Sequence, residues 1–126
     1  MTYTEITKNS VKETVENIKN ILPEYKFGVL HIHNVQETLK SKGIDFDNEC
    51  QILDICNPNI AKKFLTEDMS LSSIMPCKIS VYTNDEGETR ITMNSLVQLV
   101  DDINPDLIDE AQEIQNTLLE IIEKIK

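Results

Sequence analysis

Apolar residues along the chain follow two spacings, which separate helical segments from extended ones. The helical spacing of three or four residues occurs in segment 10–22, where Ser10 and Glu13 also form a capping box at the start. The alternating spacing of a half-buried strand occurs in segment 77–82. A turn at 84–87 then returns the chain, so this region is predicted to be a β-hairpin.

The same two spacings, together with helix-capping and helix-breaking residues, predict the other short elements. Further strands are predicted over 3–7, 27–33 and 49–56, and short helices are predicted to begin after Asn34, Asn57 and Ser95. With the hairpin, these strands give a sheet of about five strands, mixed or antiparallel, with helices packed on it. The predicted fold class is therefore α+β, and the core domain is predicted to span residues 1–100.

The clearest helix in the sequence is the last one. Asn104 and Pro105 open it with a capping side chain and a proline in the first turn. Six apolar residues then recur at 4-3-4-3-4 spacing, which is the spacing of a helix–helix seam: Leu107, Ala111, Ile114, Leu118, Ile121 and Ile125. We expect this amphipathic helix, within residues 101–126, to belong to the same domain. It buries the seam either on its own sheet or on a second copy.

The chain is short and acidic, and both properties exclude classes of function. A length of 126 residues fits one domain, and the net charge is −10, with eight acids in segment 101–126. An acidic surface repels phosphate groups, so neither nucleic acid nor an anionic membrane is an expected partner. The start of the chain lacks signal-peptide features, and three cysteines do not form a disulfide framework. These features predict a cytoplasmic protein.

Several segments resemble the family catalogued as domain of unknown function 302. The resemblance is carried by segment 27–33 (Phe-Gly-Val-Leu-His-Ile-His), Cys56-Asn57-Pro58 and segment 75–82 (Met-Pro-Cys-Lys-Ile-Ser-Val-Tyr), with smaller matches at Thr38-Leu39, Lys42-Gly43 and Cys50. It covers about residues 10–93 and leaves the C-terminal helix outside. The resemblance implies a small α+β fold with a sheet covered by helices, and self-association as a dimer. It implies no established activity.

The cysteines are the first candidates for chemistry. Cys56 ends a predicted strand where Asn57 and Pro58 begin a helix, whose dipole would favour a thiolate. The alternative is that Cys56 packs as a small apolar side chain, which is the more frequent role of a free cysteine. Cys50 lies about 20 Å along the same strand and cannot bridge to Cys56. A pair of Cys56 and Cys77, acting in redox or soft-ligand chemistry, requires their strands to be neighbours.

The two histidines are the second candidates. His31 and His33 are expected on the same face of one strand, about 7 Å apart. With Cys50, Cys56 or Cys77 on a neighbouring strand, they would form a mixed nitrogen–sulfur site for a metal or haem. No ligand pair has the spacing of a zinc finger, so no cofactor is predicted and the metal or haem hypothesis ranks last.

Three hypotheses for function remain, and a binding domain is favoured. No nucleophile elbow and no phosphate-binding loop occurs in the sequence, which makes an enzyme the less favoured class. The favoured hypothesis is a binding or interaction domain that works as a homodimer and holds a small ligand in a cleft near Cys56, Cys77 and the histidines. The second is a thiol-dependent redox protein centred on Cys56, and the third is a haem or metal binder.

Overall fold

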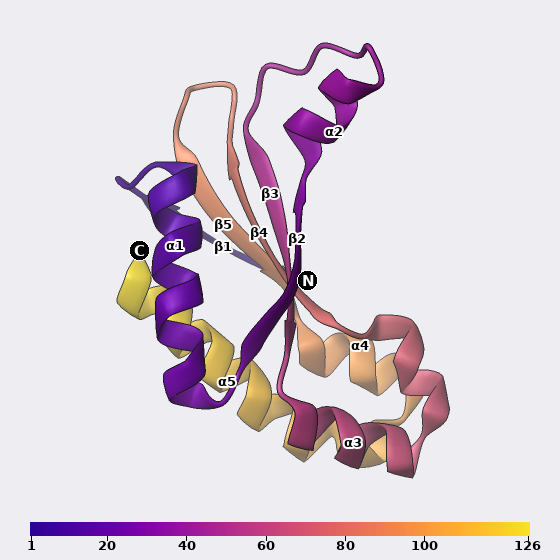
Figure 1. The fold of residues 1–126 in the computed structure, drawn as a ribbon. Helices are drawn as coiled ribbons and strands as arrows, with labels where there is room; N and C mark the ends of the chain where they lie inside the picture. Colours follow the sequence, from indigo (N-terminus) through magenta and orange to yellow (C-terminus); the bar gives the residue numbers. More distant parts are fainter.

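A computed structural model describes residues 1–126 as a single antiparallel sheet with helices. The strand order is β1-β5-β4-β3-β2 (Figure 1). The strands are β1 (Thr2–Thr7), β2 (Gly28–Asn34), β3 (Cys50–Cys56), β4 (Cys77–Thr83) and β5 (Thr89–Asn94). The α-helices are α1 (Val11–Ile21), α2 (Val35–Ser41), α3 (Pro58–Glu67), α4 (Leu96–Ile103) and α5 (Ile108–Ile125). Three short 3-10 helices complete the chain: η1 (Leu22–Tyr25), η2 (Met69–Ile74) and η3 (Pro105–Leu107).

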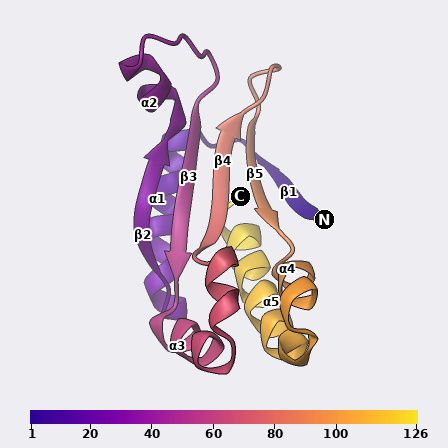
Figure 2. The same cartoon turned by 90° about the vertical axis from the view of Figure 1, so that its right-hand side faces the viewer.

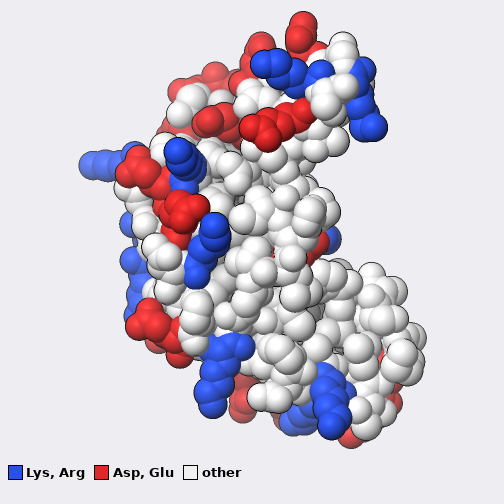
Figure 3. Space-filling view, viewed as in Figure 1, with Lys and Arg blue, Asp and Glu red and all other residues white.

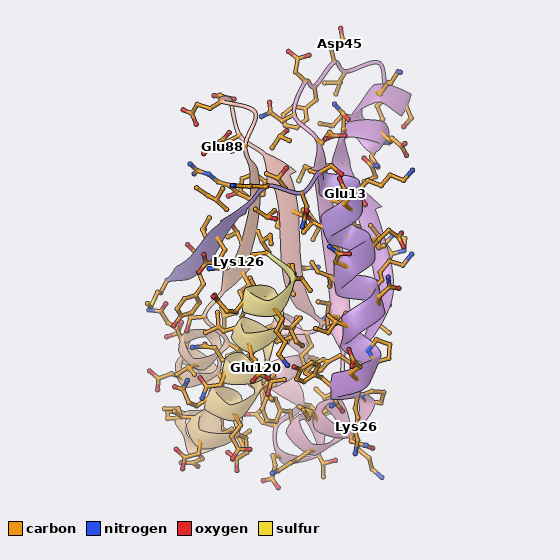
Figure 4. The ribbon with its side chains drawn as sticks, turned by 90° about the vertical axis from the view of Figure 1, so that its left-hand side faces the viewer. Glu13, Lys26, Asp45, Glu88, Glu120 and Lys126 are labelled. Atoms are coloured by element: carbon orange, nitrogen blue, oxygen red, sulfur yellow. The ribbon has the colours of Figure 1, made fainter.

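Side chains that alternate along the strands divide the sheet into a covered face and an open face. On the covered face, Leu53, Ile79 and Ile91 from the three central strands are fully buried. Helices α1 and α5 lie on this face, and their charged residues, such as Glu13 and Glu120, point outward (Figure 4). No helix lies across the middle of the open face (Figure 2). The fold thus has two layers in its middle part, with one side of the sheet uncovered.

Local sequence signals explain where the helices begin. The capping box predicted for α1 is present, with Ser10 Oγ accepting from the Glu13 backbone N–H at 3.1 Å and Glu13 Oε1 accepting from the Ser10 N–H at 3.3 Å. Asn34 caps α2 and Asn57 caps α3 through their side-chain oxygens. The predicted hairpin is formed by β4 and β5, which pair in antiparallel register. The fold class and these elements are therefore confirmed.

The C-terminal helix α5 buries its seam within its own chain. All six seam residues, from Leu107 to Ile125, are buried, and α5 packs against α4 and α1. Its one buried polar residue, Gln115, accepts hydrogen bonds from Ser95 Oγ and the Val97 N–H and donates one to Tyr3 Oη. The helix therefore closes the core of this domain. No helix in the protein is long and apolar enough to cross a membrane.

Helix α2 and the loop after it, residues 35–49, form an arm that extends beyond the sheet (Figure 1). None of the arm's residues is buried. Two large apolar side chains in it, Ile44 and Phe46, are 51% and 43% exposed. The arm nevertheless has a defined shape, because Gln36 Nε2 donates to the backbone oxygens of Phe46 and Asp47 at 3.0 and 3.1 Å.

Candidate functional site

The structure separates the predicted site residues into two groups, which lie on different faces of the sheet. The first group is Cys56, Asn57 and Cys77, at the end where β3 leads into α3 and β4 begins. Cys77 is the backbone partner of Ile55, so Cys56 is the next residue along the paired strand. All three cysteines are free. Because β3 and β4 are neighbours, the two strand ends that carry Cys56 and Cys77 lie side by side, as a Cys56–Cys77 pair requires.

Cys56 and Cys77 line one small cavity of about 30 Å³, close to the volume of one water molecule. Asn57 and Met75 also line it, and its remaining walls are apolar side chains: Phe27, Ile55, Ile60, Ala61, Phe64, Ile74, Leu96 and Ile114. The Asn57 side chain itself faces α3, where its Oδ1 accepts from the N–H groups of Asn59 and Ile60. Asn57 therefore orients the helix start, and sulfur atoms supply most of the cavity's chemistry.

The Cys77 thiol is held in its protonated form. Burial, and secondarily the nearby Cys56, raises the pKa of Cys77 to about 11 from its ordinary value of 9.0. A thiol with such a pKa is almost entirely un-ionised at neutral pH and is a poor nucleophile. For Cys77, packing in an apolar environment is therefore the correct description of the isolated protein.

A larger cavity of about 260 Å³ adjoins the first and shares Ile74, Met75, Cys77 and Leu96 with it. It lies between η2 and α4, which stand side by side below the ends of β4 and β5, with α5 behind them (Figure 2). Its other lining residues are Ser73, Pro76, Lys78, Met93, Asn94, Leu99 and Leu118. The cavity is thus mostly apolar, with a few polar groups from Ser73, Lys78 and Asn94.

The second group of predicted residues lies on the open face. His33 Nε2 is 2.8 Å from Asp54 Oδ2, and Lys78 Nζ donates to Asp54 Oδ1 at 2.5 Å. Asp54 is only 9% exposed. Its pKa is lowered from the ordinary value of 3.8, first by the hydrogen bond from Lys78 and then by the one with His33, which together outweigh burial. Three neighbouring strands therefore contribute to one charged network.

His31 completes the open-face group. A β-bulge between Val29 and His31 shifts the register of β2. His31 and His33 lie on the same face as predicted, with their ring centroids 4.4 Å apart in an edge-to-face arrangement. The two rings are therefore in contact on the open face.

The mixed nitrogen–sulfur site is not assembled. Cys77 shares the covered face with Ile55, whereas His33 contacts Asp54 on the open face, so the sheet separates them. Cys50 pairs with Tyr82 at the other end of β3. No group of three or more His, Cys, Asp and Glu side chains is placed to hold a metal ion. The predicted cleft lined by both cysteines and histidines therefore does not exist as one site.

Asp54 and Lys78 are members of the charged network that the sequence did not identify. The sequence feature that could have revealed this network is Asp54 itself, an acid between Leu53 and Ile55 at the centre of an otherwise apolar strand. A buried charge needs a partner, so its position predicts a cation on a neighbouring strand. The identity of that cation depends on strand register, which pairs Asp54 with Lys78 and His31.

The sequence model for the domain of unknown function DUF302 matches residues 3–125. The chain belongs to the DUF302 family. A crystal structure of an uncharacterized conserved DUF302 protein from Bacillus stearothermophilus is similar over 99% of this chain and 98% of that chain, with 33% identity and a TM-score of 0.93. No curated protein matches the chain.

The extent of the DUF302 match corrects one expectation. The resemblance in the sequence was placed at about residues 10–93, with the C-terminal helix as an addition beyond it. The match to residue 125 includes α5, and the similar structure covers it as well. The physical reason is that the seam of α5 is part of the single hydrophobic core, together with residues of the sheet and of α1. The helix therefore belongs to the DUF302 domain itself.

Proposed function

We propose that this DUF302 protein is a homodimeric binding domain that holds a small, largely apolar ligand in the larger cavity beside Cys77. The observation that carries the proposal is the cavity itself, about 260 Å³ with apolar walls and polar groups from Ser73, Lys78 and Asn94. Small-molecule sites in proteins combine a concave apolar lining with a few polar groups that orient the ligand. At about 30 Å³ for each water-sized unit, the cavity takes a ligand of roughly nine non-hydrogen atoms.

Indole is a suitable probe for this cavity, because it is flat, apolar and has a single N–H donor. The protein contains no tryptophan, so the fluorescence of added indole has no tryptophan background. We expect a saturable blue shift on binding. Leu99→Phe, which fills the cavity from α4, should abolish the shift. Leu119→Phe, a matched change on α5 outside this cavity, should preserve it. Unsaturable binding, or equal binding by both variants, contradicts the proposal.

The homodimer is supported by the arm and by the open face of the sheet. The molecule is hollowed on the open side, between the arm and the part that contains α3 and α4 (Figure 3). The arm exposes Ile44 and Phe46, and its loop carries the acids Asp45, Asp47 and Glu49. The open face carries the cations Lys78 and Arg90 on its central strands, where they pair with Asp54 and Glu88. Exposed apolar side chains flanked by charged groups are suited to an interface between copies.

In the proposed dimer, the arm of each copy lies in the hollow of the other. Phe46→Glu places a charge in this contact and should convert the dimer to a monomer in light-scattering measurements of mass. Asn17→Glu adds the same charge on α1, on the covered side, and should leave the dimer intact. A wild-type monomer would refute the dimer, and an unchanged mass for Phe46→Glu would refute this interface. The indole measurement is independent of both outcomes.

A thiol-dependent redox function is the second candidate, favoured by one observation. Cys56 and Cys77 are free and line the same cavity. Their oxidation would form one disulfide and transfer two electrons and two protons to the oxidant. The high pKa of Cys77 slows this reaction. Rapid formation of a Cys56–Cys77 bridge by a mild thiol oxidant in the Cys50→Ser variant, measured by mass spectrometry, would support it. A protein that stays reduced would refute it.

A further inference from the structure

Three of the residues that line the small cavity carry sulfur, which neither an apolar core nor the proposed ligand cavity requires. The chain has three cysteines and four methionines, and two of the cysteines and one methionine line the same 30 Å³ space. These residues are Cys56, Met75 and Cys77. They come from three different segments: the end of β3, the residue after η2, and the start of β4.

The other residues around this cavity offer no hard ligand. Apart from Asn57, whose side chain is occupied as the cap of α3, every other lining residue is hydrocarbon or aromatic. The histidines lie on the opposite face, and no carboxylate lines the space. Two thiols and a thioether form a soft donor set, which selects Cu(I) among the common metal ions. Zinc is disfavoured because a structural zinc site needs four ligands in a tetrahedron.

We propose that Cys56 and Cys77, assisted by Met75, form a binding site for a single Cu(I) ion in the small cavity. Binding replaces the two thiol protons, which pass to the buffer, by two sulfur–copper bonds, and the copper remains Cu(I) throughout. Two thiolates and one monovalent cation leave a net charge of −1 in the site. That charge lies beside the N-terminus of α3, because Cys56 directly precedes the cap Asn57, and the helix dipole stabilises it.

The size and the apolar lining of the cavity fit a bare ion. Its volume of about 30 Å³ admits one ion with no room for coordinated water. The surrounding side chains, which include Phe27, Phe64 and Leu96, give the metal an apolar shell. Such a shell favours the reduced ion, because a larger charge is costly in an apolar environment. The same shell keeps Cys77 protonated until a metal arrives.

The experiment uses the full chain, reduced and handled without oxygen, and titrates it with Cu(I) held by a competing chelator. Wild-type protein should remove one Cu(I) per chain. Cys56→Ser and Cys77→Ser should each weaken binding by roughly a hundredfold or more, and Met75→Leu by roughly tenfold, since even outer-shell changes at metal sites cost ten- to a hundredfold. Cys50→Ser is the matched control, because Cys50 lies at the far end of β3, and it should bind like wild type.

X-ray absorption of the wild-type complex provides a readout that does not depend on the variants folding. A first shell of sulfur alone supports the site, whereas nitrogen or oxygen in that shell overturns it. Absence of Cu(I) binding, a preference for zinc, or an equal loss in Cys50→Ser would also overturn it. The proposal does not depend on a ligand in the larger cavity. Leu99→Phe, which should abolish indole binding, should leave Cu(I) binding unchanged, so the two proposals can fail separately.

Discussion

Gln115 connects α5 to two parts of the molecule that are distant in sequence, and its removal should cost a large part of the stability. The side chain is 4% exposed. It accepts from Ser95 Oγ at 3.0 Å and from the Val97 N–H at 3.1 Å, and it donates to Tyr3 Oη at 3.1 Å. It therefore fixes the start of α4, which forms one wall of the larger cavity, and the edge strand β1.

The cost of Gln115→Ala follows from these contacts. Three hydrogen bonds at a net value of about 1 kcal/mol each, and one buried methylene at about 0.8 kcal/mol, give a loss of about 4 kcal/mol. The free energy of unfolding of a domain is about 5–15 kcal/mol, so the loss is large. With a urea slope of about 2 kcal/mol/M, the midpoint of unfolding followed by far-UV circular dichroism should fall by about 2 M.

Two further variants decide whether the hydrogen bonds of Gln115 are the cause of this loss of stability. Gln112 lies on the exposed side of the same helix and bonds only to Asn116, so Gln112→Ala should change stability by less than about 0.5 kcal/mol. Tyr3→Phe should cost about 1 kcal/mol in the wild type and almost nothing in the Gln115→Ala background, because its partner is already absent. If Gln115→Ala costs no more than Gln112→Ala, the hydrogen-bond argument is wrong.

Three other predictions concern single side chains. The raised pKa of Cys77 gives the fold a stability contribution that is complete below pH 9.0 and is lost as the pH rises toward 11, so the wild type should lose roughly 3 kcal/mol more than Cys77→Ala over that range in urea unfolding. The lowered pKa of Asp54 acts in the opposite direction: the stability advantage of wild type over Asp54→Asn should be complete above pH 3.8 and should shrink as the pH falls below it. Asn57→Ala should lower the free energy of unfolding by about 1 kcal/mol because α3 loses its cap, and a urea midpoint equal to wild type would contradict this.

The helices and strands could be predicted from the sequence because their signals are local. A capping box, an asparagine cap and an alternating hairpin each act within a few residues, and all were found where they were expected. All six residues predicted for the seam of α5 are buried. The surface that covers the seam could not be predicted, because a heptad spacing identifies an apolar helix face and does not identify what packs on it.

The charged network on the open face could not be predicted because it depends on register. Asp54, Lys78 and His33 lie on three strands that are joined by connections of different lengths, and a shift of one residue in either pairing would turn a partner to the other face. The bulge in β2 is a further example. It lies between Val29, which pairs with Ile55 of the covered face, and His31, which pairs with Asp54 of the open face. The bulge therefore decides that His31 and His33 lie on the open face, and nothing in the segment Gly28–Asn34 marks its position.

The position of Cys56 shows how the end of a strand can bring together residues that simple alternation separates. Alternation places Cys56 on the face opposite Ile55 and Cys77, yet Cys56 and Cys77 line the same cavity. Cys56 is the last residue of β3, and the chain turns there into α3 under the control of the Asn57 cap. The cavity therefore forms where the regular strand stops. A change that extended β3 by one residue would move the Cys56 sulfur to the open face, away from Cys77 and Met75, although both cysteines would still be present in the sequence.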